Sequence, residues 1–286
     1  MASHVETVLS SLSPQVALIN TLRQGSIPNH IGFIMDGNRR WANSRGFPVA
    51  KGHYLGSKAL LKTVESCLML GVKSITMYAF SIENFNRSND QVHQLMALFK
   101  FMLIDYSRPG KIADQYNMSI RVVGRLDLLD DDFRKKIDYA IKRTGGNTNG
   151  VLNLCVAYTS RDEVSRAMKE TVHQCCEQGL PVESITDKSI AAHMDVTDDI
   201  PVDIVVRTSR VQRLSDFLLW QSHRDTDIQI VDVLWPDFDL WQLFLVILRW
   251  QRKQDGFEPA RASGISVPFK LFSCILMTIL LGLCIF

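Results

Sequence analysis

The chain has 286 residues, ordinary apolar content and a formal net charge of +2. This length suits one large α/β domain, or two small ones, with a sizeable core. The balanced charge, without a basic stripe interleaved with aromatic residues, argues against nucleic-acid binding.

The N-terminal segment, residues 1–26, has no basic stretch followed by an apolar one, so we expect no signal peptide. Apolar side chains recur through Val5–Arg23. They predict a short amphipathic helix, or one broken by Pro14. Such a helix packs against the domain or lies on a membrane surface, and we favour packing.

From residue 27 to residue 256, strand-like runs alternate with helix-like runs, without an internal repeat or a low-complexity linker. The expected strands are Ile31–Met35, Ser74–Phe80, Ser119–Gly124, Val151–Tyr158, Asp203–Arg207 and Ile228–Leu234. The expected helices are Gly56–Leu70, Gln91–Tyr106, Asp131–Arg143, Asp162–Glu177, Asp187–His193 and Asp239–Lys253. The strands are almost continuously apolar, as in a sheet covered on both faces. The pattern predicts a single α/β domain with a mostly parallel six-stranded sheet flanked by helices.

The tail, residues 257–286, ends in the uncharged run Leu271–Phe286. As a helix this run would extend ~24 Å, slightly less than the ~30 Å hydrocarbon core of a bilayer. Phe269 and Lys270 would lengthen it by snorkelling. We expect membrane association, because such a run left in water would aggregate. Burial on a partner protein is the alternative.

The cysteines show neither metal-binding nor disulfide spacing. We interpret them as small apolar residues in a reducing compartment. They are Cys67, Cys155, Cys175, Cys176, Cys274 and Cys284.

Polar and glycine residues follow the first, second and fifth expected strands. They are Asp36, Gly37, Asn38, Arg39 and Arg40; Ser81, Asn84 and Arg87; and Arg207, Arg213 and Ser215. Because parallel strands end at one edge of a sheet, arginines from three strands converge beside one carboxylate. Clustered arginines need anionic partners, and a carboxylate suits Mg²⁺. We therefore predict a site for more than one phosphate group; separate surface ion pairs are the alternative.

No P-loop or GxGxxG motif accompanies this set, so a nucleotide is not implied. His53 either hydrogen-bonds a phosphate or is a solvated loop residue. The acidic clusters Asp127–Asp132 and Asp195–Asp199 are predicted to cap helices rather than bind metal. The apolar face of Gln91–Tyr106 is either core or the wall of an apolar tunnel, and core is the default.

Several long motifs occur in a defined order. They are His30-Ile-Gly-Phe-Ile-Met-Asp36-Gly-Asn-Arg-Arg40, Tyr78-Ala-Phe-Ser-Ile-Glu-Asn-Phe-Asn-Arg87, Arg207-Thr-Ser209, Arg213-Leu-Ser-Asp-Phe-Leu-Leu-Trp-Gln221 and Asp232-Val-Leu-Trp-Pro236. Over roughly residues 27–250 the chain resembles the cis-prenyltransferases (undecaprenyl and dehydrodolichyl diphosphate synthases), in particular the eukaryotic dehydrodolichyl branch. The resemblance implies an undecaprenyl diphosphate synthase-like fold with an apolar tunnel. It also implies condensation of farnesyl diphosphate with successive isopentenyl diphosphates, each adding a cis double bond. The product would be dehydrodolichyl diphosphate, the dolichol precursor for protein glycosylation.

The resemblance also implies roles for individual residues. Asp36 would hold Mg²⁺ and the allylic diphosphate, with Asp227 the nearest candidate for a second metal ligand. The diphosphate cradle would be Gly37, Asn38, Arg39 and Arg40, with His53 as a further phosphate contact. The isopentenyl diphosphate ligands would be Arg87, Arg207, Arg213 and Ser215. Proton removal would be assisted by Asn38, Ser81 and Asn84, with the base itself left open.

The chain departs from the family pattern at Val49, where many members have Arg, and at Gln91, where many have Glu. Arg210-Val211 replaces the usual Gly-Glu. The segment 252–256 lacks the Arg-x-Gly that completes a substrate site in homodimeric members. The chain thus resembles the catalytic subunit of a heterodimer whose Nogo-B receptor-type partner supplies that motif. Such enzymes act at the endoplasmic reticulum membrane, with the active site on the cytosolic side.

Two other functions compete with the enzyme. One is a non-catalytic scaffold subunit of such a complex, and the other is a general phosphoprotein- or nucleotide-binding module. The convergence of Asp36, Asn38, Arg87, Arg207 and Arg213 favours the enzyme, because a scaffold has no need of these groups in one cleft.

Overall fold

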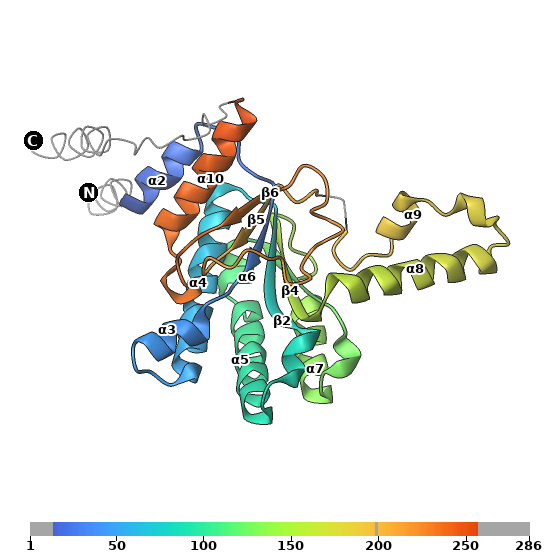
Figure 1. The fold of residues 1–286 in the computed structure, drawn as a ribbon, viewed down its shortest axis with the longest axis horizontal. Helices are drawn as coiled ribbons and strands as arrows, with labels where there is room; N and C mark the ends of the chain where they lie inside the picture. The colour runs from blue at the N-terminus through green and yellow to red at the C-terminus, as the bar shows by residue number, and fades with distance from the viewer. Residues whose placement is uncertain (1–13, 198–199, 257–286) are drawn as a thin grey trace, which may run out of the picture. The chain divides into compact units, whose positions relative to one another are not determined.

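A computed structural model describes residues 14–197 and 200–256 (Figure 1). These residues contain a six-stranded sheet in the order β3-β4-β2-β1-β5-β6, with every neighbouring pair parallel. Its strands are β1 His30–Ile34, β2 Ser74–Ser81, β3 Met118–Val123, β4 Gly150–Tyr158, β5 Ile204–Arg207 and β6 Asp227–Ile230. The predicted α/β class and parallel six-stranded sheet are confirmed.

Burial explains the sequence of each strand. Every residue of β1 and of β5 is buried, so both strands read as continuous apolar runs apart from the His30 and Arg207 ends. The edge strand β6 differs, because Ile228 and Ile230 are exposed and only Gln229 is buried. Its two isoleucines favour a strand although they are exposed, because β-branched residues have a high strand propensity.

Helices cover the sheet, and four short 3₁₀ turns connect elements of the described chain (Figure 1). The helices are α2 Pro14–Leu22, α3 Asn38–Ser44, α4 Val49–Leu70, α5 Asn89–Ser107, α6 Ile112–Gln115, α7 Asp131–Thr144, α8 Ser160–Glu177, α9 Asp187–Ala191 and α10 Leu240–Gln254. The 3₁₀ turns are η1 Ile82–Asn86, η2 Leu126–Leu128, η3 Val182–Ser184 and η4 Trp235–Asp237. The chain divides into two units after Gln251; the described part of the second ends at Gly256.

The described part of the leading helix is packed. Pro14 is the first residue of α2, a position that proline fits because it lies in the first turn of a helix. Ile19 and Leu22 are buried, and the Gln251 amide of α10 donates to Leu22 O at 2.8 Å. The predicted residues before Pro14 lie outside the described residues.

Two local expectations were wrong. Helix α4 begins at Val49, directly after Pro48, and not at Gly56. Asp195 caps no helix; it follows α9 and pairs with Arg166 at 2.5 Å. In the other acidic cluster, Asp130 accepts a hydrogen bond from Phe133 N at 2.8 Å, so the predicted cap of α7 is confirmed.

The membrane prediction falls on residues that are not described. Among residues 14–197 and 200–256, no helix is both long enough and apolar enough to span a bilayer. The run Leu271–Phe286 lies outside this range, as do Cys274 and Cys284. Of the described cysteines, all four are free thiols, and three of them are buried.

Candidate active site

Parallel pairing of β1 with β5 brings their carboxyl ends together. Ile34 stands opposite Arg207 in the register, and Asp36 follows two residues later. Arg207 Nη2 donates to Asp36 Oδ2 at 2.8 Å, and Thr208 Oγ1 donates to Asp36 O at 2.6 Å. Sheet topology therefore fixes a carboxylate against a guanidinium from a distant part of the chain.

Arg207 is the buried centre of this group, with a side chain only 3% exposed. Its Nη1 donates to Ser215 Oγ at 2.7 Å and also to Arg213 O. Its Nε is buried and has no hydrogen-bond partner in the described structure. Arg207 thus holds Asp36 on one side and the segment carrying Arg213 and Ser215 on the other.

The turn after Asp36 leads directly into α3. Gly37 has φ of 111°, a left-handed conformation that favours glycine, and a Cβ there would lie 2.9 Å from a Leu234 methyl carbon. Asn38 opens the helix; its Nδ2 donates to Met35 O at 3.1 Å. Its buried Oδ1 has no hydrogen-bond partner among the described residues. A buried acceptor is thus left unsatisfied next to Asp36.

Two glycines of α4 allow that helix to approach Asn38. A Cβ added at Gly52 would lie 2.3 Å from Asn38 O, and one added at Gly56 would lie 2.1 Å from Asn38 Oδ1. Trp235 of η4 closes the same corner, because its Nε1 donates to Gly56 O at 2.8 Å and its N donates to Asp36 O at 3.0 Å. The position of Asn38 is therefore set by close packing.

Arg39, Arg87 and His53 lie together without an acidic partner in the described chain. Burial and then the neighbouring Arg39 charge lower the pKa of Arg87, against an opposing effect of Asp36. Burial, followed by the charges of Arg87 and Arg39, lowers the pKa of His53 to about 4. His53 is therefore neutral at pH 7, and the arginines form a positive field that an anion would relieve.

Three further predicted residues, Arg40, Ser81 and Asn84, have hydrogen bonds or ion pairs within the chain. Arg40 turns toward Ser209 and stands 3.4 Å from Asp36 Oδ1, instead of joining Arg39. Ser81 caps η1: its Oγ accepts from Glu83 N at 3.2 Å, and Ser81 N donates to Asn84 Oδ1 at 3.3 Å. Ser81 and Asn84 are thereby held at the end of β2.

A cavity of about 430 Å³ collects most of these groups. Of the predicted site residues, it is lined by Asp36, Asn38, Arg39, His53, Ser81, Asn84, Arg87, Arg207, Arg213 and Ser215. An adjoining cavity of about 380 Å³ shares Asp36, Asn38, Arg39, His53 and Arg87 with it and adds Gly37 and Arg40. The predicted convergence at the carboxyl edge is therefore present in the structure.

The other end of the larger site cavity is apolar. Leu60, Leu95, Leu98, Phe99 and Met102 line it. A small apolar cavity of about 20 Å³ shares Leu60, Phe99 and Met102 and extends to Phe133 and Val156. Helix α5 thus contributes both to the core and to the cavity wall, the two alternatives that its sequence pattern left open.

The comparisons with known proteins agree with this geometry. A family model described as "Putative undecaprenyl diphosphate synthase" matches residues 34–258. A dehydrodolichyl diphosphate synthase complex subunit of Schizosaccharomyces pombe is 39% identical over 237 residues, covering 83% of this chain and 90% of the relative. The Homo sapiens dehydrodolichyl diphosphate synthase complex subunit is 39% identical over 243 residues, 85% of this chain and 72% of its own length. The chain belongs to the cis-prenyltransferase family.

Solved structures show the same relationship. Lavandulyl diphosphate synthase from Lavandula x intermedia, in complex with dimethylallyl diphosphate, matches with a TM-score of 0.74 and 28% identity, covering 78% of this chain and 95% of that one. A probable undecaprenyl diphosphate synthase from Campylobacter jejuni has a TM-score of 0.64 and 24% identity, covering 84% of this chain and 100% of that one. The second likeness shows the fold alone.

The carboxylate available to a metal in this cis-prenyltransferase is Asp36. Burial acts to raise its pKa, but the hydrogen bond and charge of Arg207, with the charge of Arg40, outweigh burial and lower it. Residues 14–197 and 200–256 hold no cluster of three or more His, Cys, Asp or Glu side chains arranged to bind a metal ion. Mg²⁺ usually binds one or two carboxylates, with water and substrate phosphates completing its shell. An ionised Asp36 beside a cluster of arginines fits that donor set.

Asp227 does not reach Asp36 within the chain. It is the first residue of β6 and pairs in register with Ile204, so it lies at the amino edge of the sheet, whereas Asp36 follows the carboxyl end of β1. Gln229 Nε2 donates to its Oδ2 at 2.7 Å. The expectation that Asp227 supplies a second ligand beside Asp36 is corrected on this ground, because a residue that begins a parallel strand faces the opposite edge.

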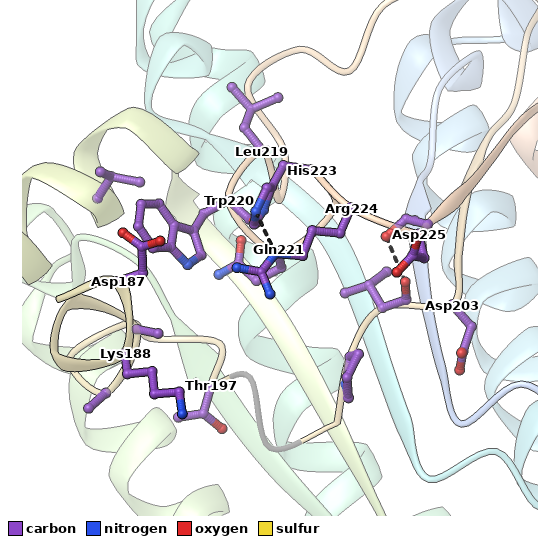
Figure 2. A pocket seen from close by; sticks show the side chains of 16 residues that line it. Asp187, Lys188, Thr197, Asp203, Leu219, Trp220, Gln221, His223, Arg224 and Asp225 are labelled. Atoms are coloured by element: carbon purple, nitrogen blue, oxygen red, sulfur yellow. Dashed lines mark hydrogen bonds between the residues drawn. The ribbon is translucent and has the colours of Figure 1, made fainter.

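A cavity of about 1190 Å³ lies elsewhere in this cis-prenyltransferase, between α9 and the segment 219–226 (Figure 2). Lys188 and Arg224 line it together with Asp187, Asp203 and Asp225. It contains no predicted site residue, and charges of both signs alternate around it. Size alone therefore does not identify the site; the smaller cavity has the converging polar groups.

Proposed function

We propose that the chain is a Mg²⁺-dependent prenyl-chain elongating enzyme that condenses farnesyl diphosphate with several isopentenyl diphosphates. The proposed product is a long-chain dehydrodolichyl diphosphate with cis double bonds. One observation carries the proposal: a single cavity is lined both by charged and polar groups around Asp36 and by apolar side chains around Phe99. A lipid diphosphate has this same division between a charged head and an apolar chain.

Two groups of residues suit two diphosphates. Arg39 and Arg87 have no acidic partner in the described chain, and both line the same two cavities as Asp36. We assign the allylic diphosphate to Asp36, Gly37, Asn38, Arg39 and Arg40, with His53 as a neutral hydrogen-bonding group. We assign the isopentenyl diphosphate to Arg87, Arg207, Arg213 and Ser215.

In the proposed reaction the allylic C1–O bond breaks and its electron pair leaves with the diphosphate. The terminal carbon of the isopentenyl double bond forms the new bond to C1, and C2 of the isopentenyl unit loses a proton. Mg²⁺ held by Asp36 would stabilise the charge that develops on the leaving diphosphate. The arginines orient both substrates, and the apolar wall excludes water from the developing cation. We assign assistance of the proton loss to Asn38, Ser81 and Asn84.

The partner and the membrane belong to the same proposal. Relatives are named as subunits of a dehydrodolichyl diphosphate synthase complex. The segment 252–256 lacks the Arg-x-Gly motif of homodimeric members, which supports a Nogo-B receptor-type partner that supplies it. We further propose that the enzyme works at the endoplasmic reticulum membrane with its site on the cytosolic side, and that the apolar run Leu271–Phe286 supports this attachment.

The deciding experiment is incorporation of labelled isopentenyl diphosphate into long-chain lipid with Mg²⁺ present. It compares the chain alone, the chain with a Nogo-B receptor-type partner, and the Asp36→Ala variant with that partner. Activity only with the partner, lost in the variant, is the expected result. Full activity of the chain alone would overturn the heterodimer, and no activity in any combination would favour the scaffold function.

Primer choice is tested in the same assay. Archaeal relatives at 35% identity are named as geranylgeranyl-diphosphate specific, so the family accepts more than one primer. We expect kcat/KM to be higher with farnesyl than with geranylgeranyl diphosphate. The reverse order would refute the proposed primer while leaving the reaction type intact.

A further inference from the structure

The segment that carries Arg213 and Ser215 is strained. Seven non-glycine residues of the described chain have positive φ, and five of them lie in residues 209–218. They are Ser209 (77°), Arg210 (58°), Ser215 (50°), Asp216 (61°) and Leu218 (47°). A side chain with a Cβ disfavours this conformation, so it persists only where surrounding contacts impose it.

The first turn of α8 supplies contacts to the centre of this segment. Asp216 Oδ2 accepts from Arg161 Nε at 2.7 Å, and its Oδ1 accepts from Arg161 N at 3.1 Å. Ser160 N donates to Asp216 O at 2.8 Å, and Leu219 N donates to Ser160 Oγ at 3.0 Å. Arg161 is the residue that holds both oxygens of the Asp216 carboxylate.

Arg161 has a second, weaker contact. Its Nη2 stands 3.5 Å from Glu83 Oε1, with the two side chains 75% and 69% exposed. Exposed pairs of this kind contribute little. The Asp216 side chain is only 11% exposed, and removing the cation from a largely buried carboxylate has a larger effect. Loss of Arg161 should therefore act mainly through Asp216.

Movement of Asp216 would be transmitted to the site through its neighbour. Ser215 Oγ accepts from Arg207 Nη1 at 2.7 Å, and Ser215 O accepts from Tyr78 OH at 3.0 Å. Arg207 in turn binds Asp36. Arg161 is not among the residues that line the site cavity, so its influence passes through the segment and not through substrate contact.

We propose that Arg161 is a positioning residue that holds the strained segment 213–218, so that Arg213 and Ser215 face the diphosphate of the isopentenyl substrate. This inference rests on the proposed function of the site. It assigns a role to a side chain that contacts neither substrate.

The kinetic test compares Arg161→Ala and Arg161→Lys with the unaltered enzyme, each with the partner subunit if activity requires it. In Arg161→Ala we expect the KM for isopentenyl diphosphate to rise about tenfold, with smaller changes in kcat and in the KM for farnesyl diphosphate. Arg161→Lys should recover part of the loss. Combining Arg161→Ala with Asp216→Asn should add little to either single change. Additive effects, or equal changes in both KM values, would overturn the proposal.

Hydrogen exchange gives a readout that does not need activity. Amides of residues 213–221 should exchange faster in Arg161→Ala than in the unaltered chain, while those of α7 stay unchanged. The matched control is Arg134→Ala, which removes an exposed arginine paired within α7 to Asp131. Unchanged exchange in 213–221, or faster exchange throughout the chain, contradicts the inference. An inactive unaltered enzyme would instead refute the proposed function, and the exchange result would still decide this one.

Discussion

The amino and carboxyl edges of the sheet differ in whether their buried polar groups have hydrogen-bond partners. At the amino edge, buried His30 contacts Ile200 O at 2.8 Å and Thr76 Oγ1 at 2.7 Å, and Asn153 Nδ2 donates to that hydroxyl at 3.0 Å. Asp203 Oδ2 accepts from His30 N at 3.0 Å. At the carboxyl edge, by contrast, arginines face one another and buried polar atoms lack partners.

This difference separates stability from function. Among the described residues, four buried side-chain polar atoms have no hydrogen-bond partner, and Asn38 Oδ1 and Arg207 Nε are two of them. None belongs to His30, Thr76 or Asn153. Satisfied groups lower the free energy of the fold, whereas Asn38 Oδ1 and Arg207 Nε stay unsatisfied beside Asp36, where a ligand would bind. Changes at the two edges should therefore have different readouts.

The largest effect is expected from Asp36→Ala at the carboxyl edge. Loss of the carboxylate removes the proposed metal ligand, so kcat should fall about a thousandfold, while the KM for farnesyl diphosphate changes far less. The measurement is the initial rate at saturating Mg²⁺, and Asp131→Ala on the surface of α7 is the control. Near-normal turnover of Asp36→Ala would show that Asp36 has no such role.

The next effect concerns the amino edge and is seen in stability. Burial lowers the pKa of His30 from 6.5 to about 4, against the opposing effects of Ile200 O and Asp203. The unfolded chain takes up this proton near pH 6.5 and the folded chain only near pH 4. The stabilisation, about 3 kcal/mol, is therefore complete above pH 6.5 and is lost as the pH falls toward 4.

Urea unfolding at several pH values measures this effect. His30→Gln should flatten the fall in unfolding free energy between pH 6.5 and 4, while the exposed His173→Gln should leave it unchanged. An identical pH profile in His30→Gln and the unaltered chain would mean that His30 does not cause the pH dependence of the unfolding free energy.

A smaller but sharper test uses Gly56→Ala. The added Cβ would lie 2.1 Å from Asn38 Oδ1, so Asn38 must move. We expect kcat to fall about a hundredfold, as misplacement of an orienting group by an ångström can do. The matched control is Gly146→Ala, where a Cβ would meet nothing within 4 Å. Equal rates in the two variants would show that the position of Asn38 does not matter.

The smallest expected effect is a gain in stability when a positive charge is removed from the site. Arg87→Gln removes the repulsion with Arg39 and should stabilise the chain by about 0.5 kcal/mol, while weakening substrate binding. Added salt should stabilise the unaltered chain more than the variant, because salt screens this repulsion. Thermal unfolding at low and high salt measures both. A Tm lower than that of the unaltered chain would indicate that Arg87 is paired.

The carboxyl edge was predictable because it depends on strand ends. Apolar β-branched runs placed β1 and β5 to within about a residue, and parallel strands bring residues such as Asp36 and Arg207 to a common edge. Whatever follows those strands in the sequence then converges in space. This is why the convergence of these residues at one edge could be predicted from the sequence.

The expectations that failed depend on packing. The first turns of α4 were not predicted, because Gly52 and Gly56 disfavour an isolated helix. In the folded chain these glycines are needed, since they allow α4 to approach Asn38 closely. Asp227 was proposed only from the family resemblance, and it begins β6, at the opposite edge of the sheet from Asp36. The hydrogen bond from Arg161 to Asp216 joins two distant segments, and Asp216 has a positive φ. A local sequence pattern predicts neither feature.

The pairing of Asp36 with Arg207 has a consequence for synthesis. These residues are 171 positions apart, and β1 is bordered by β2, made soon after it, and by β5, made much later. While the ribosome is still translating the middle of the chain, the nascent β1 has one open edge, and the Asp36 carboxylate that follows it lacks Arg207. Such edges recruit other chains. We therefore expect nascent chains that end before residue 204 to need protection by a chaperone. The need should disappear once the complete chain is released.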